Sequence, residues 1–207
     1  MRRVDGFSTL GLLSDPIYSF MTEYSLYALA ELIIHEQTHA TVFIKNEIQF
    51  NEELATFVGR EGALTFLRSR SGTDSDAYTQ ALAALEDWEV FRERIMDLHD
   101  QLERVYAREA DREQILAEKQ RTVEEFNRRL LSEAPELFRT ERFRSFQGVP
   151  ANNAYIMSFV RYTQDLDLFY DLYAANGRDL RSTVEELKRL KTTKGPPKHA
   201  LQRLIAE

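Results

Sequence analysis

The chain has 207 residues and a net charge of −7, with hydrophobic residues at 43% and charged residues at 29%. This length fits one globular domain, and the composition is that of a soluble globular protein with a sizeable core. The acidic balance argues against general nucleic-acid binding, zero cysteines exclude disulfides and thiolate metal sites, and no apolar run of about 18 residues exists to form a transmembrane helix.

The N-terminal part of the chain predicts a short strand followed by a helix. Residues 6–13 form the strand, Asp15 and Pro16 form a turn, and the helix continues to about residue 42. Its first half has helical spacing without Pro or Gly and ends on two apolar residues, Ile33 and Ile34. A solvated surface helix is more polar, so the pattern indicates a buried one. The first residues lack the apolar run of a signal peptide.

Residues 35–39 read His-Glu-Gln-Thr-His, which is an HExxH motif. On a helix, residues four apart share a face, so His35 and His39 can bind one metal ion together. Glu36 lies beside that pair, where a carboxylate can take a proton from a metal-bound water. A chance match is expected in roughly one chain of this length in a few hundred, and the apolar helical context strengthens the signal. The motif therefore predicts a zinc peptidase.

A catalytic zinc ion needs a third protein ligand, and the segment after the motif offers one. Residues 42–50 are predicted to be extended, and a second helix opens at Asn51, a good N-cap residue. The Asn-Glu-x-x-Ala pattern there resembles the helix on which glutamate zincins present their third ligand, which favours Glu52. Glu53 lies about 100° round the helix, so both cannot face the metal. Glu61 is a weaker candidate, and acidic residues also suit a first helical turn for electrostatic reasons.

The helix from Asn51 ends near residues 69–72, and residues 75–133 then form a long charged helical segment. Apolar residues spaced three and four apart in it predict one buried stripe, as core or as a helical hairpin. A partner-binding coiled coil, including helix-mediated self-association, is the alternative. The stripe consists of Leu82, Leu85, Trp88, Phe91, Ile95, Leu98, Leu102 and Val105.

The last third of the chain adds shorter elements. Arginine and phenylalanine alternate within residues 139–149, and the acidic whole favours a packed connection there over a nucleic-acid site. A break at Gly148–Pro150 follows, and Asn152 is placed to cap the next helix. A last helix covers about residues 180–190, and residues 191–207 are expected to be partly flexible.

Four segments together resemble the bacterial "putative aminopeptidase" family, whose members are predicted zinc metallopeptidases of the HExxH-plus-Glu, or gluzincin, type. The resemblance spans about residues 6–175. It implies a mainly α, single zincin-like domain over residues 1–207, with a minimal N-terminal strand, two catalytic helices and a long helical hairpin. The four segments are Phe7–Gly11 with Asp15–Pro16, His35–His39, Phe50–Val58 with Arg60–Gly62, and Asn152–Ala154 with Tyr162.

Members of this family usually have a substantial N-terminal portion, often starting as a lipoprotein, whereas this chain reaches its motif after 34 residues. The usual N-terminal portion is therefore expected to be missing. The compartment is left open. The cell envelope or periplasm is expected if a lipoprotein-type N-terminus is missing, and the cytoplasm otherwise.

The resemblance implies a peptide substrate and one Zn²⁺ per chain, held by His35, His39 and Glu52, with a water in the fourth position. Glu36 is then the general base, which takes the proton of that water and later passes it to the leaving amine. The oxyanion needs a second donor besides the zinc ion. Tyr162 is the candidate implied for that role.

Further substrate contacts follow from the same resemblance. Tyr155 is the next candidate for the oxyanion donor after Tyr162. Asn152 and Asn153 are candidates for hydrogen bonds to the substrate, and helix capping explains them nearly as well. By analogy with zincins, the segment before the active helix adds the peptide as an extra strand. Its residues are Ser8, Thr9, Leu10 and Gly11.

Aminopeptidase specificity requires a carboxylate for the α-ammonium group of the substrate, and Glu47 and Glu53 are available near the motif. Two alternatives to a peptidase stay open at this stage. One is a metal-binding but catalytically inactive remnant that acts as a helical interaction module. The other is a scaffold whose segment 75–133 binds a protein partner.

Overall fold

The computed structural model describes residues 19–162, 166–193 and 195–206. In these ranges the chain is mainly helical and contains no strand, which confirms the predicted helical class. The predicted strand, with Ser8, Thr9, Leu10 and Gly11, lies outside the described residues. The chain divides into two compact units: unit 1 comprises 1–78 and 165–207, and unit 2 comprises 79–164.

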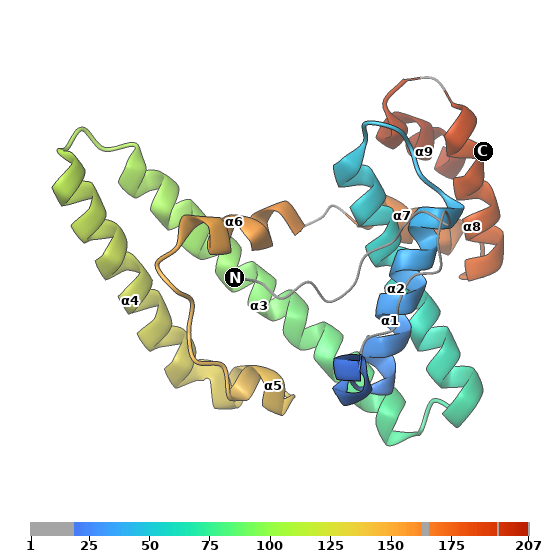
Figure 1. Cartoon of the computed structure of the whole chain (residues 1–207), viewed down its shortest axis with the longest axis horizontal. Helices are drawn as coiled ribbons and strands as arrows, with labels where there is room; N and C mark the ends of the chain where they lie inside the picture. The colour runs from blue at the N-terminus through green and yellow to red at the C-terminus, as the bar shows by residue number, and fades with distance from the viewer. Residues whose placement is uncertain (1–18, 163–165, 194, 207) are drawn as a thin grey trace. The chain divides into compact units, whose positions relative to one another are not determined.

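Unit 1 brings together helices from both ends of the chain (Figure 1). Two helices from the N-terminal part, α1 and α2, form its most extensive helix pair. Helices from the C-terminal part, α7, α8 and α9, complete its core. The elements of unit 1 are η1 (Ser19–Glu23), α1 (Leu26–Thr41), α2 (Ile48–Ser71), α7 (Asp167–Ala175), α8 (Leu180–Arg189), η2 (Leu190–Thr192) and α9 (Pro197–Ala206).

The core of unit 1 is built on Phe57 of α2. Its ring stacks on Phe169 of α7 at 5.8 Å and meets Tyr173 edge-on at 5.7 Å between centroids. Aromatic pairs of this kind add stability beyond the area that they bury. Leu187 of α8 and Leu201 of α9 are fully buried in the same cluster. Within the C-terminal segment expected to be partly flexible, the structure thus contains a packed helix.

Unit 2 contains most of α3 (Asp76–Tyr106), together with α4 (Arg112–Leu137), α5 (Glu141–Arg144) and α6 (Asn153–Tyr162). The predicted apolar stripe of α3 is buried from residue 91 onward and shares one core with α4. Residues 107–111 join the two helices, and the Asp111 side chain accepts a hydrogen bond from Gln114 N at 2.8 Å to cap α4. The stripe therefore serves as core. Its buried members are Phe91, Ile95, Leu98, Leu102 and Val105.

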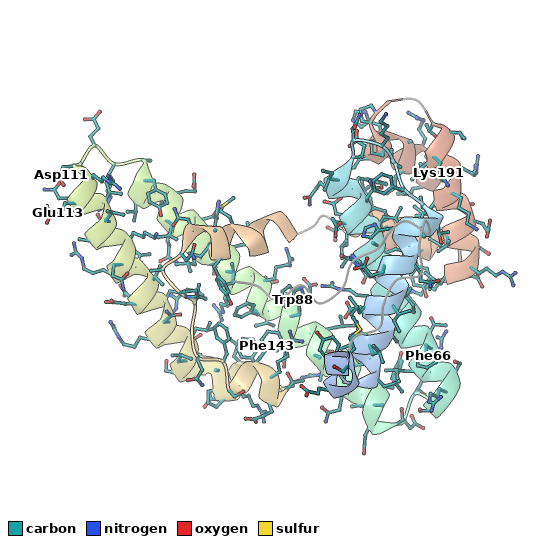
Figure 2. The ribbon with its side chains drawn as sticks, viewed as in Figure 1. Phe66, Trp88, Asp111, Glu113, Phe143 and Lys191 are labelled. Carbon is teal, nitrogen blue, oxygen red and sulfur yellow. The ribbon has the colours of Figure 1, made fainter. Side chains whose placement is uncertain are left out.

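The basic and aromatic segment after α4 is a packed connection, as the sequence predicts. Phe143 of α5 is buried, with its ring 5.5 Å from Phe91 and 5.3 Å from Phe138. Trp88 lies beside it at 6.4 Å (Figure 2). The rings of this segment therefore contribute to the core of unit 2.

Asp87 ties α3 to the start of α5, and its removal should destabilise unit 2. The side chain is 2% exposed and accepts hydrogen bonds from Arg139 N at 2.8 Å and Thr140 N at 2.7 Å. Replacing Asp87 by Ala leaves both amides without this partner, which should lower the free energy of unfolding by about 2–4 kcal/mol. Urea unfolding followed by Trp88 fluorescence measures this. Exposed Asp97 on the same helix provides the control, since Asp97→Ala should change stability by less than about 0.5 kcal/mol; equal losses in both variants would contradict the assignment.

Candidate metal centre

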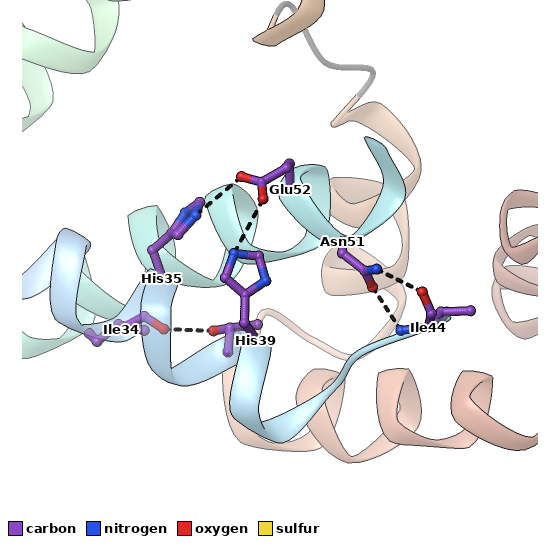
Figure 3. A network of polar contacts seen from close by, with 7 residues as sticks. Ile34, His35, His39, Ile44, Asn51 and Glu52 are labelled. Carbon is purple, nitrogen blue, oxygen red and sulfur yellow. Dashed lines mark hydrogen bonds and ion pairs between the residues drawn. The ribbon is translucent and has the colours of Figure 1, made fainter. Parts of the chain in front are cut away.

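Helix α1 presents the two motif histidines on one face. Ser25 caps it by accepting a hydrogen bond from Ala28 N at 3.2 Å, and the helix ends at Thr41, close to the predicted end. The rings of His35 and His39 stand one turn apart with centroids 4.9 Å from each other. Their Nε2 atoms both face the side chain of Glu52 on α2 (Figure 3).

The loop between the two helices is fixed by Asn51. Helix α2 begins at Ile48, so the prediction that Asn51 caps this helix is wrong. Its buried amide instead binds the backbone of Ile44: Nδ2 donates to the carbonyl oxygen at 2.8 Å, and Oδ1 accepts from the backbone N at 2.9 Å (Figure 3). Asn46 adopts a positive φ of 68° between them, which returns the chain toward α2. These two hydrogen bonds fix the start of α2, and therefore Glu52, relative to the loop that follows α1.

The three side chains converge to a spacing that suits a metal ion. Oε2 of Glu52 lies 3.5 Å from Nε2 of His35, and Oε1 lies 3.5 Å from Nε2 of His39. All three donor atoms lie within 4.8 Å of one another. Donors around a tetrahedral zinc ion stand about 3.3 Å apart, given bonds of about 2.0–2.1 Å. The donor set therefore fits a single small cation after minor adjustment.

Glu53 is directed to a different partner. It is 2% exposed, accepts a hydrogen bond from Gln49 Nε2 at 3.0 Å, and forms an ion pair with Lys198 Nζ of α9 at 3.2 Å. The two neighbouring glutamates thus have separate surroundings: Glu52 faces the histidines, and Glu53 faces the C-terminal helix. Of the two, only Glu52 belongs to the cluster that could hold a metal.

The electrostatics of the site favour metal-binding protonation states. Burial lowers the pKa of His39, although the nearby carboxylate of Glu52 opposes this effect. A hydrogen bond with His35 lowers the pKa of Glu52, so this group is ionised at neutral pH. Neutral imidazole and ionised carboxylate are the forms that coordinate metals. Two imidazoles and one carboxylate are also a ligand set of catalytic zinc sites, which leave one position open.

Glu36 lies half-buried next to His35 on α1. Helical geometry places it about 100° round the axis from His35 and about 60° from His39. It is not a member of the three-residue cluster. Its position beside the cluster is therefore compatible with the predicted role as a base, and distinct from that of a ligand.

Glu61, the weaker ligand candidate, lies away from the other candidate ligands. Nine residues separate it from Glu52, which places it about half a turn round α2. Burial raises its pKa, while hydrogen bonds with Tyr170 and Tyr173 of α7 act in the opposite direction. These contacts give Glu61 a packing role between α2 and α7.

Four further predicted site residues, namely Tyr155, Tyr162, Asn152 and Asn153, belong to unit 2. Tyr162 is the last residue of α6, and its side chain lies outside the described part of the structure. Tyr155 packs against the core of unit 2. Asn152 Oδ1 accepts a hydrogen bond from Ala154 N at 2.9 Å at the start of α6, as a capping side chain does, and Asn153 Oδ1 accepts one from a tyrosine hydroxyl of α3 at 2.9 Å. The predicted contacts of these residues with substrate stay predictions.

Comparison with known proteins gives one family match, and it covers both helices that carry the candidate metal ligands. The family model described as "Putative aminopeptidase" matches residues 1–201. Neither the curated proteins nor the solved structures give a match to this chain. None of the helices in the described ranges is long and apolar enough to span a membrane.

Proposed function

Because the chain belongs to the "Putative aminopeptidase" family, we propose that it is a zinc-dependent peptidase that removes residues from the N-terminus of peptides. The observation that supports this most directly is the convergence of His35, His39 and Glu52. The family supplies the peptidase class, and the donor set supplies the choice of metal, because two imidazoles and one carboxylate leave a coordination position for water.

In this proposal, His35, His39 and Glu52 hold the ion. A zinc ion, when bound, would lower the pKa of its bound water to about 7 and would polarise the scissile carbonyl. Glu36 accepts the proton of the attacking water and returns it to the leaving amine. Ionised Glu52 balances part of the positive charge of the ion.

The substrate side of the proposal rests on the resemblance. Tyr162 is proposed as the second donor to the oxyanion, and the segment from Ser8 to Gly11 as the strand that pairs with the peptide backbone. Between the two carboxylates considered for the α-ammonium group, Glu47 is the better candidate, because the charge of Glu53 is already matched by Lys198.

The test measures bound metal and metal-dependent hydrolysis in the same preparations. We expect about one zinc per chain. Dialysis against a chelator should remove the zinc and the hydrolysis of peptides with a free N-terminus, and added zinc should restore both. The same peptides with an acetylated N-terminus provide the matched control and should resist cleavage. Absence of metal after zinc is supplied would refute the metal site, and equal cleavage of acetylated peptides would refute the aminopeptidase assignment.

A further inference from the structure

Helices α1 and α2 approach each other closely at Gly59 of α2. A Cβ atom added there would lie 3.1 Å from the carbonyl oxygen of Glu31 and 3.3 Å from Cβ of His35. Both atoms belong to the backbone of α1 or are fixed directly to it. Neither can rotate away, so a side chain at position 59 requires the helices to separate by a few tenths of an ångström.

Gly59 is also linked to the third candidate ligand through α2. Seven residues, or about two helical turns, separate Glu52 from Gly59, so both lie on the face of α2 that meets α1. A helix in a packed core moves as a stiff rod, so an outward shift at position 59 is passed to Glu52. Metal–ligand distances tolerate only about 0.2 Å of variation.

We infer that Gly59 is a positioning residue of the metal centre: its missing side chain lets α2 lie close enough to His35 for Glu52 to reach both histidines. This inference rests on the proposed zinc site and adds a determinant of its geometry. Glycine is a weaker helix former than alanine, so its presence in the middle of a 24-residue helix is explained by the close approach and by nothing local.

Gly62 provides a matched control on the same helix. A Cβ atom there would lie 2.9 Å from Cδ1 and 3.0 Å from Cγ2 of Ile34, and both atoms belong to a side chain of α1 and not to its backbone. The added methyl group therefore meets side-chain atoms that can shift by a few tenths of an ångström, whereas the one at position 59 meets the backbone of α1. Replacing Gly62 by Ala therefore introduces the same methyl group into the same helix pair without displacing His35.

The experiment compares the wild type with Gly59→Ala and Gly62→Ala in three measurements. Zinc affinity is obtained by competition with a chromophoric chelator, the geometry of the site by the visible absorption of the Co²⁺-substituted protein, and folding by thermal melting in a chelator. Gly59→Ala should weaken zinc binding by about 10- to 100-fold, as for other residues that orient ligands, and alter the Co²⁺ bands. Gly62→Ala should retain wild-type affinity within about threefold and the wild-type bands.

Three outcomes would overturn the inference. Wild-type zinc affinity and Co²⁺ bands in Gly59→Ala would show that the approach at Gly59 does not control the site. Unfolding of metal-free Gly59→Ala under conditions where Gly62→Ala stays folded would assign Gly59 to the fold alone. If the wild type itself binds no zinc, the proposed function fails and this inference fails with it, so the two failures are told apart by the wild-type measurement.

Discussion

Replacing Glu36 by Gln should abolish peptide hydrolysis and leave the zinc ion in place. The amide has nearly the same shape as the carboxylate but cannot accept the proton of the attacking water. General base catalysis contributes about 10²- to 10⁴-fold, so kcat should fall by at least about 100-fold. Zinc content should stay at the wild-type level, because Glu36 is not part of the three-residue cluster. Both quantities should be measured on the same preparations.

The neighbouring residue supplies the control for this substitution. Gln37 is exposed on the same turn of α1, and Gln37→Ala should leave zinc content and kcat within about threefold of the wild type. Hydrolysis at the wild-type rate in Glu36→Gln would show that another group is the base. Loss of zinc from Glu36→Gln would assign Glu36 to the support of the metal site instead.

The helix that carries the two candidate histidine ligands could be predicted from sequence because its geometry is local. In the HExxH motif, the four-residue spacing alone fixes both histidines on one face of a helix, and the structure has this helix from Leu26 to Thr41. The apolar stripe of α3 is predicted correctly from Phe91 onward, since its period follows from the turn of a helix, but its first predicted member, Leu82, is exposed.

Contacts that depend on a turn or on distant parts of the chain could not be predicted from the sequence. Asn51 resembled a helix cap, because its residue type favours that position, yet a turn through Asn46 brings Ile44 back to its side chain. The ion-pair partner of Glu53 is Lys198, 145 residues further along the chain. No local pattern marks that pair.

The proposed role of Gly59 could not be predicted from the sequence either. The chain has eight glycines, and sequence gives no reason to separate Gly59 from the others. Its role depends on the backbone of α1, which comes within 3.1 Å of the position that a Cβ atom would occupy. This distance depends on how α1 and α2 pack against each other, which the residue type does not reveal.

Replacing Glu52 or Glu53 by Ala should produce opposite effects. Glu52→Ala removes one of three protein donors and should weaken zinc binding by more than about 100-fold. Its effect on the stability of the metal-free protein should be small, because the side chain is 32% exposed. Zinc competition and chemical unfolding in a chelator measure the two quantities separately.

Glu53→Ala should retain zinc and lose stability. It removes the carboxylate that Gln49 and Lys198 both contact. The free energy of unfolding should therefore fall by about 1–3 kcal/mol. The two substitutions delete the same group from adjacent positions of one helix, so they change net charge and helix propensity equally. Any difference between them must therefore come from the direction that each side chain takes. Retention of zinc by Glu52→Ala together with its loss from Glu53→Ala would reverse the ligand assignment.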